Sequence, residues 1–251
     1  MVGDGRFDAG RRRWLAGVAE TTALAVWPGV GVSADAAVAT VAAAPAAAAE
    51  LDGLVARFGA LPANGEVRRV FAAGPPAGVL LAAVAPQKLL GWPMKLPAQA
   101  RAWMGEPLAD LPYLGRLAGR GSTMPLEALL ELQPDLVLDS GTVDATYLSG
   151  TERLHRQTGL PCVLVQGGLA DSARQLRAVG ALLGESARVE RLAAFADEVL
   201  RLAAQVTRDV SAEQRPRVYL ARGVAGLETA RIGAINAEVI ELAGGRNVAV
   251  E

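Results

Sequence analysis

The stretch that decides the fold is Leu126-Glu127-Ala128-Leu129-Leu130-Glu131-Leu132-Gln133-Pro134-Asp135-Leu136-Val137-Leu138-Asp139. Its first half predicts a helix, because Pro125 suits a first helical turn and Pro134 cannot continue a helix. Its second half, 135–139, predicts a short buried strand. A helix that leads directly into an apolar strand is typical of proteins in which helices cover a parallel sheet.

The same alternation extends in both directions from this stretch. We expect further strands at 67–73, 88–92 and 161–166, and further helices at 77–85, 144–158 and 171–183. The fold class is therefore α/β, with a lobe built on a parallel sheet.

A long amphipathic helix is predicted from Ser186 to about Val210, because its apolar residues recur at three- and four-residue spacing. A strand at 217–221 and a helix at 236–243 then begin a second α/β series. The expected organisation is an export signal (1–34), an alanine-rich tail or linker (35–65), an N-terminal α/β lobe (66–184), a long connecting helix (185–212) and the start of an incomplete C-terminal α/β lobe (213–251).

The N-terminus has the layout of an export signal. Arg11, Arg12 and Arg13 precede a mildly apolar stretch that ends in Val32-Ser33-Ala34. The adjacent arginines are similar to the twin-arginine form of signal. No cysteine follows this segment, so we expect a periplasmic protein without an N-terminal lipid anchor. The alternative, a membrane anchor, would bury Glu20, Pro28 and several glycines in lipid.

Composition excludes several classes of function. The net charge is −1 and the pI about 6.0, so no broad basic surface for nucleic acid is available. The single cysteine, Cys162, and the single histidine, His155, provide no multi-residue metal site, and we expect a buried cysteine and a surface histidine. The hydrolase motif Gly-x-Ser-x-Gly and the phosphate-binding motif Gly-x-x-x-x-Gly-Lys are both absent, and we expect no cofactor.

Three stretches together resemble one family. They are the run from Leu114 to Asp139, the run from Pro86 to Trp92, and the run from Ile235 to Val248. This combination is similar to the periplasmic substrate-binding proteins of ABC importers for iron-siderophore complexes and cobalamin, over residues 67–251.

The resemblance implies two α/β lobes joined by a long helix, with the ligand held between them. It also implies a monomer that delivers its ligand to an ABC permease in the inner membrane. Members dock through one exposed glutamate in each lobe, and Glu127 matches the first. The second would lie beyond residue 251, so we expect an incomplete second lobe. A ferric-siderophore-like complex is the expected ligand, with cobalamin, haem or an oxyanion as alternatives.

Ligands of open α/β sheets bind outside the carboxyl ends of the strands. The loops expected there begin near Gly74, Ser140, Gly167 and Arg222. Arginines are candidates for binding an anionic ligand because guanidinium makes paired bonds to planar oxygens. The candidate ligand contacts are Pro75, Pro76, Trp92, Arg120, Ser140, Gly141, Thr142 and Arg222, with no catalytic residue and no metal ligand.

Two alternatives stay open. Asp139-Ser140-Gly141 resembles the aspartic-protease signature, in which two carboxylates share one proton. That chemistry needs a second copy of the signature and an all-β fold, which the βα pattern contradicts. The other alternative is a purely structural or truncated fragment that does not deliver a ligand.

Overall fold

The protein is described here by a computed structural model that covers residues 53–63, 66–118 and 121–250. All of these residues belong to one compact unit, 45–251. The expected export signal, most of the expected linker and the candidate ligand contact Arg120 lie outside the described residues.

The main sheet has four strands in the order β1-β4-β3-β2. The three strands β2 (Val70–Ala72), β3 (Leu136–Gly141) and β4 (Cys162–Gln166) run parallel to one another. The edge strand β1 (Val55–Phe58) pairs antiparallel with β4, so that Val55 faces Val165. The mixed α/β class and the mostly parallel sheet expected from the sequence are confirmed.

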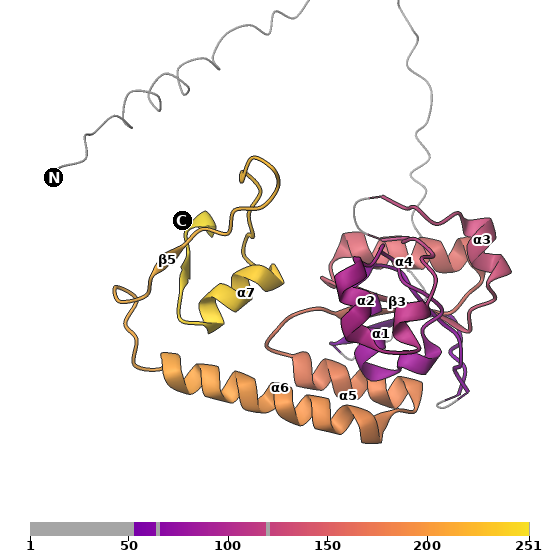
Figure 1. The fold of residues 1–251 in the computed structure, drawn as a ribbon, viewed down its shortest axis with the longest axis horizontal. Helices are drawn as coiled ribbons and strands as arrows, with labels where there is room; N and C mark the ends of the chain where they lie inside the picture. Colours follow the sequence, from indigo (N-terminus) through magenta and orange to yellow (C-terminus); the bar gives the residue numbers. More distant parts are fainter. Residues whose placement is uncertain (1–52, 64–65, 119–120, 251) are drawn as a thin grey trace, which may run out of the picture. The chain divides into compact units, whose positions relative to one another are not determined.

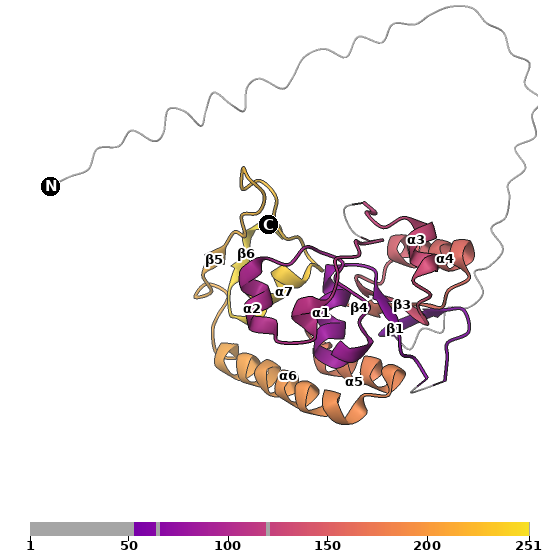
Figure 2. The ribbon, with the colours of Figure 1, turned by 45° about the vertical axis from the view of Figure 1, so that its right-hand side comes forward.

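Helices cover both faces of this sheet, as the views in Figures 1 and 2 show. One core joins the sheet to α1 (Pro75–Val84) and α5 (Ser172–Leu183), and the other joins it to α3 (Leu126–Glu131) and α4 (Ala145–Thr158). Alternation along the strands separates the two cores, since successive side chains point to opposite faces. On β3, for example, Leu136 and Leu138 join the first core whereas Val137 joins the second.

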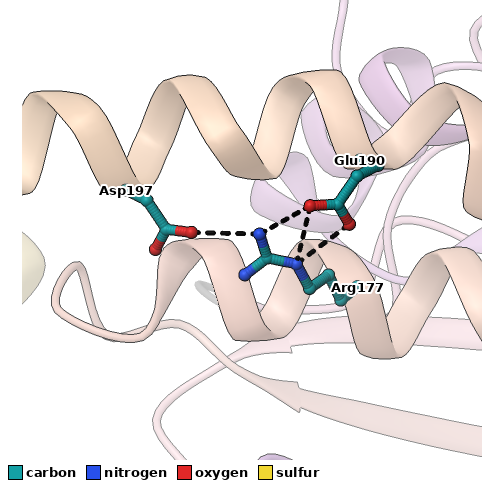
Figure 3. Close-up of polar contacts among 3 residues, drawn as sticks. All are labelled: Arg177, Glu190 and Asp197. Atoms are coloured by element: carbon teal, nitrogen blue, oxygen red, sulfur yellow. Dashed lines mark hydrogen bonds and ion pairs between the residues drawn. The ribbon is translucent and has the colours of Figure 1, made fainter.

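The long helix α6 (Ser186–Thr207) packs beside α5 (Figures 1 and 2). The contact is close because Gly180 of α5 faces Val189 of α6, where a Cβ on the glycine would lie 2.9 Å from the valine Cβ. Arg177 of α5 adds polar contacts: its guanidinium binds the carboxylates of Glu190 and Asp197 on α6 at 2.8 and 3.0 Å (Figure 3). The predicted long helix is therefore present, and its first half is fixed to the lobe.

The second half of α6 exposes an apolar stripe. Phe195 and Val206 are each 70% exposed, and Val199 and Leu202 lie between them on the same face. After α6 come a two-stranded parallel sheet, β5 (Arg217–Val218) with β6 (Arg246–Asn247), and the helix α7 (Ile235–Leu242). The strand expected over 217–221 is thus only two residues long.

Other elements also differ from the sequence-based expectation. Strand β1 lies inside the segment 35–65 that was expected to be a tail or linker. The strand expected at 88–92 is wrong: a 3₁₀ turn, η1 (Pro86–Lys88), is followed by isolated bridges from Leu89 to Val70 and from Trp92 to Tyr113. The segment after it, which was expected to be broken by prolines, contains α2 (Ala98–Met104) and a second turn, η2 (Leu108–Asp110).

Candidate ligand site

A pocket of about 740 Å³ opens beside the carboxyl half of β3, on the face of the sheet that α4 covers. Its walls come from the end of β2, the segment before α3, strand β3 and helix α4. The lining side chains include Leu117, Ser122, Asp139, Tyr147, Thr151, Arg153 and Gln157.

Asp139 is the buried polar group of this pocket. It follows Val137 on the same face of β3, so the strand directs its carboxylate toward α4. The residue is 7% exposed, and its Oδ1 accepts a hydrogen bond from the backbone N–H of Ser140 at 2.9 Å. Burial raises the pKa of Asp139 to about 6, against a smaller lowering by that hydrogen bond. The pocket wall therefore holds a carboxyl group that changes charge close to neutral pH.

Helix α4 forms the wall of the pocket opposite β3, and its first turn is fixed by a side-chain cap. The side chain of Asp144 accepts hydrogen bonds from the backbone N–H groups of Thr146 and Tyr147, both at 2.9 Å. The Tyr147 ring then lies over Gly141, where a Cβ would come within 3.2 Å of the ring. Gly141 thus allows the aromatic wall to approach the end of β3.

The lining residues of α4 other than Tyr147 were not considered from the sequence. Tyr147, Thr151 and Leu154 recur at three- and four-residue spacing and line the pocket together. That spacing was the available signal, because one face of the helix carries Tyr147 and Thr151 beside the aliphatic Leu154. Asp139 had been considered only for a protease reaction.

The candidate ligand contacts occupy three kinds of position. Ser140 and Gly141 are the last residues of β3 and pair with β4, so they belong to the strand and not to the loop after it. Thr142 follows them and is exposed. Pro75 and Pro76 form the first turn of α1, directly after β2. These residues lie at the carboxyl ends of neighbouring strands, as expected.

Trp92 and Arg222 lie elsewhere. Trp92 is 1% exposed, and its indole Nε1–H donates to the backbone oxygen of Leu108 at 2.8 Å. It is a core residue and does not line the pocket, which corrects its assignment as a cleft aromatic. Arg222 is exposed in the segment after β5, where its backbone pairs with Glu228. The structure does not bring Arg222 to the pocket.

The docking candidate Glu127 is exposed in the first turn of α3. This position suits contact with a partner protein, and it equally suits a solvated carboxylate. His155 was expected on the surface, but it is half-buried over Gly59, with Nδ1 2.8 Å from the backbone oxygen of Leu160. Cys162 is buried as expected.

Within the described residues, no group of three or more His, Cys, Asp or Glu side chains is placed to hold a metal ion. Nor does any helix of that part of the chain combine the length and apolar character needed to cross a membrane. The α/β sheet around Asp139 also differs from the all-β fold that the protease alternative requires.

The chain belongs to the periplasmic binding protein family, because the family model matches residues 79–251. Members of this family are solute-binding proteins of ABC transporters, exported from the cytoplasm, that deliver a ligand to a membrane permease. No curated protein sequence matches the chain.

Solved structures of such proteins share the fold. An ABC transporter solute-binding protein from Sulfurospirillum deleyianum superposes with a TM-score of 0.63 and 22% identity, covering 75% of this chain and 58% of that one. A molybdate-binding protein of Haemophilus influenzae superposes with a TM-score of 0.56 and 18% identity, covering 76% of this chain and 63% of that one. A vitamin B12-binding protein of Vibrio cholerae superposes with a TM-score of 0.53 and 19% identity, covering 74% of this chain and 67% of that one. The chain thus spans less than two thirds of the length of the first two.

Proposed function

We propose that this protein captures a ferric-siderophore or related metal complex and carries it to an ABC permease in the inner membrane, without chemistry on the ligand. Within the family, the observation that carries the choice of ligand is the pocket beside β3. Its volume of about 740 Å³ is in the range of sites for drug-sized organic molecules, roughly 300–1,000 Å³.

The lining of the pocket also favours an organic chelate over a bare oxyanion. A small oxyanion would leave most of this volume unfilled, and it would meet the carboxyl group of Asp139 in a buried wall. Two negative charges in such a place repel each other and lack water to screen them. A chelate instead offers apolar surface to Tyr147 and hydrogen-bond donors to Asp139.

Further contacts are proposed from the residues at the carboxyl ends of the strands, namely Pro75, Pro76, Ser140, Gly141 and Thr142, with Arg120 for anionic groups. Delivery is proposed to use Glu127 as a docking carboxylate for basic residues of the permease. Export by the twin-arginine route is proposed from Arg11, Arg12 and Arg13.

Thermal denaturation of the purified protein with hydroxamate, catecholate and carboxylate ferric siderophores, cobalamin, haem and molybdate tests the capture step. We expect a saturable rise of the midpoint with one class of ferric complex, because a ligand that binds only the folded state stabilises it. Tyr147→Ala should weaken that binding about tenfold or more. Trp103→Ala is the matched control, since Trp103 is 90% exposed and does not line the pocket.

A rise only with cobalamin, haem or molybdate would assign another ligand class, and no rise with any of them would contradict capture. Delivery is read out separately as cellular uptake of the radiolabelled complex. Glu127→Arg should lower uptake and leave binding unchanged, whereas Glu131→Arg, one turn further along α3 and also exposed, should change neither.

A further inference from the structure

The wall of the pocket contains one buried carboxyl group that lacks a charged partner. Asp139 lines the pocket and is 7% exposed. In the part of the chain that the structure describes, its side chain accepts one hydrogen bond, from the backbone N–H of Ser140, and forms no ion pair. Buried carboxylates are normally paired with a cation or with several donors. Most of the hydrogen-bonding capacity of Asp139 is therefore unused.

The neighbouring start of helix α1 does not fill this capacity. A Cβ at Gly74 would lie 3.6 Å from Oδ1 of Asp139, so the helix begins beside the carboxyl group. The first residues of a helix usually offer N–H groups to an anion. Here these residues are Pro75 and Pro76, which have no N–H to donate. The pocket is therefore the open direction from which a partner can reach Asp139.

The charges around the pocket leave its wall negative. Among the described residues that line it, the charged side chains are those of Asp139 and Arg153, and Arg153 is exposed on α4. The lining residues from β2, β4 and the segment before α3 carry no charge, and α4 adds the phenol of Tyr147. Because the pKa of Asp139 is about 6, its carboxyl group is mostly ionised above neutral pH. A positively charged group is the natural partner for such a wall.

An aromatic ring lies within reach of the same position. Gly141 follows Asp139 by two residues on β3, so it lies on the same face, about 7 Å along the strand. The ring of Tyr147 covers Gly141, where a Cβ would come within 3.2 Å of the ring. Aromatic rings attract cations that lie within about 6 Å of the ring centre. A cation that contacts Asp139 can therefore also contact Tyr147.

We propose that Asp139 and Tyr147 form a subsite for a protonated amine, so that the ligand carries an ammonium group as well as apolar surface. The inference rests on the proposed function and deepens it by naming a chemical group that the pocket recognises. An ammonium group supplies both a counter-ion and hydrogen-bond donors to the buried carboxylate, whereas a neutral group supplies donors alone. Binding should therefore be tight where Asp139 is ionised and weak where it is protonated.

The test is a titration of the full chain with benzylammonium chloride, which joins an ammonium group to an aromatic ring. The ¹H–¹⁵N cross-peak of Ser140 reports binding, because this N–H contacts the carboxylate of Asp139; sodium chloride at equal ionic strength is the reference. We expect a saturable shift at pH 7.5. At pH 4.5, where Asp139 is protonated and benzylammonium keeps its charge, the affinity should fall at least about tenfold.

Two comparisons at pH 7.5 separate charge from shape. Benzyl alcohol replaces the ammonium group by a hydroxyl and should bind at least about tenfold more weakly than benzylammonium. Asp139→Asn should weaken benzylammonium binding by a similar factor and remove its pH dependence. Glu131→Gln is the matched control, since it removes an exposed carboxylate that does not line the pocket, and it should bind like the original protein.

The inference is overturned if benzylammonium gives no saturable shift, if benzyl alcohol binds as tightly, or if the affinity is the same at both pH values. The pH comparison uses the original protein, so it does not depend on the folding of a variant. Benzylammonium carries no metal, so this result is separate from the ferric-siderophore panel. A null panel with a saturable benzylammonium response would remove the proposed ligand class and keep the subsite, whereas the reverse would keep capture and remove the subsite.

Discussion

At the scale of a single residue, Asp139 carries an energetic penalty that the fold tolerates. Its carboxyl group is 7% exposed, and burial holds its pKa near 6 instead of the ordinary 3.8. The folded protein therefore binds the proton more tightly than the unfolded chain does. It follows that the contribution of this group to stability is highest below pH 3.8 and is lost as the pH rises through 6.

Asp139→Asn should therefore stabilise the protein in a pH-dependent way. Asparagine can accept the same hydrogen bond from Ser140 and carries no charge, so the variant should be more stable than the original by about 1 to 3 kcal/mol at pH 8. Near pH 4 the gain should vanish. Urea denaturation at pH 4 and pH 8 measures the difference in the free energy of unfolding between the two proteins. The other carboxyl groups are common to both proteins, so their titration does not contribute to this difference. An equal difference at both pH values would contradict a raised pKa of Asp139.

At the scale of elements, the packing of α5 on α6 depends on a glycine. The Cβ that alanine would add at Gly180 lies 2.9 Å from the Cβ of Val189, which is fully buried. Real Cβ atoms do not approach so closely, so one helix would have to move. The ion pairs of Arg177 bridge the same two helices, but they are exposed and add little by comparison.

Gly180→Ala should destabilise the protein, although alanine is the better helix former. Overpacking costs about 1–3 kcal/mol, which exceeds the gain in helix propensity of up to about 1 kcal/mol. Gly150→Ala in α4 is the matched control: apart from its own turn of helix, nothing lies within 4 Å of its Cβ position, so only the gain in helix propensity remains. Chemical denaturation measures the stability of both variants. A stabilised Gly180→Ala variant would show that α6 does not pack as closely on α5 at Gly180 as the structure indicates.

The elements that the sequence predicted well are those in which the local signal and the packing agree. Helix α4 begins where Asp144 provides a cap, and the strands β3 and β4 begin with apolar runs, Leu136–Leu138 and Cys162–Val165, that are buried on both faces. The segment 88–92 has the apolar composition of a strand, yet only single bridges form, because Pro86 sets a 3₁₀ turn and Trp92 turns into the core to reach Leu108. The positions of Trp92 and of the pocket residues of α4 are set by contacts between segments far apart in the sequence, and local composition does not predict such contacts.

At the scale of the whole molecule, strand β1 shows what local patterns miss. Val55–Phe58 follows a long alanine-rich stretch and precedes prolines and glycines, so it was assigned to a linker. Its strand character comes from pairing with β4, and Phe58 is 6% exposed in the second core. Residues 55–58 therefore complete the sheet as its edge strand.

Phe58→Ala tests this directly, because it should be neutral in a linker and damaging in a core. Truncation of a buried phenylalanine costs about 3–5 kcal/mol, so we expect a large fall in the denaturation midpoint. Ala60→Ser, at an exposed position two residues later, should leave the midpoint unchanged. Equal denaturation midpoints for the two variants would show that Phe58 is not part of the core and that this segment is a linker.

The pairing of β1 with β4 also determines the order in which the sheet is assembled. Val137 and Cys162 are neighbours in the sheet and close in sequence, whereas Val55 must wait for Val165, about four times further along the chain. Closing the longer loop costs roughly 1 kcal/mol more in chain entropy. In a growing chain, β1 therefore has no partner until β4 has been synthesised to residue 166, and until then β1 and the edge of β3 that β4 will cover are open to pairing with other chains.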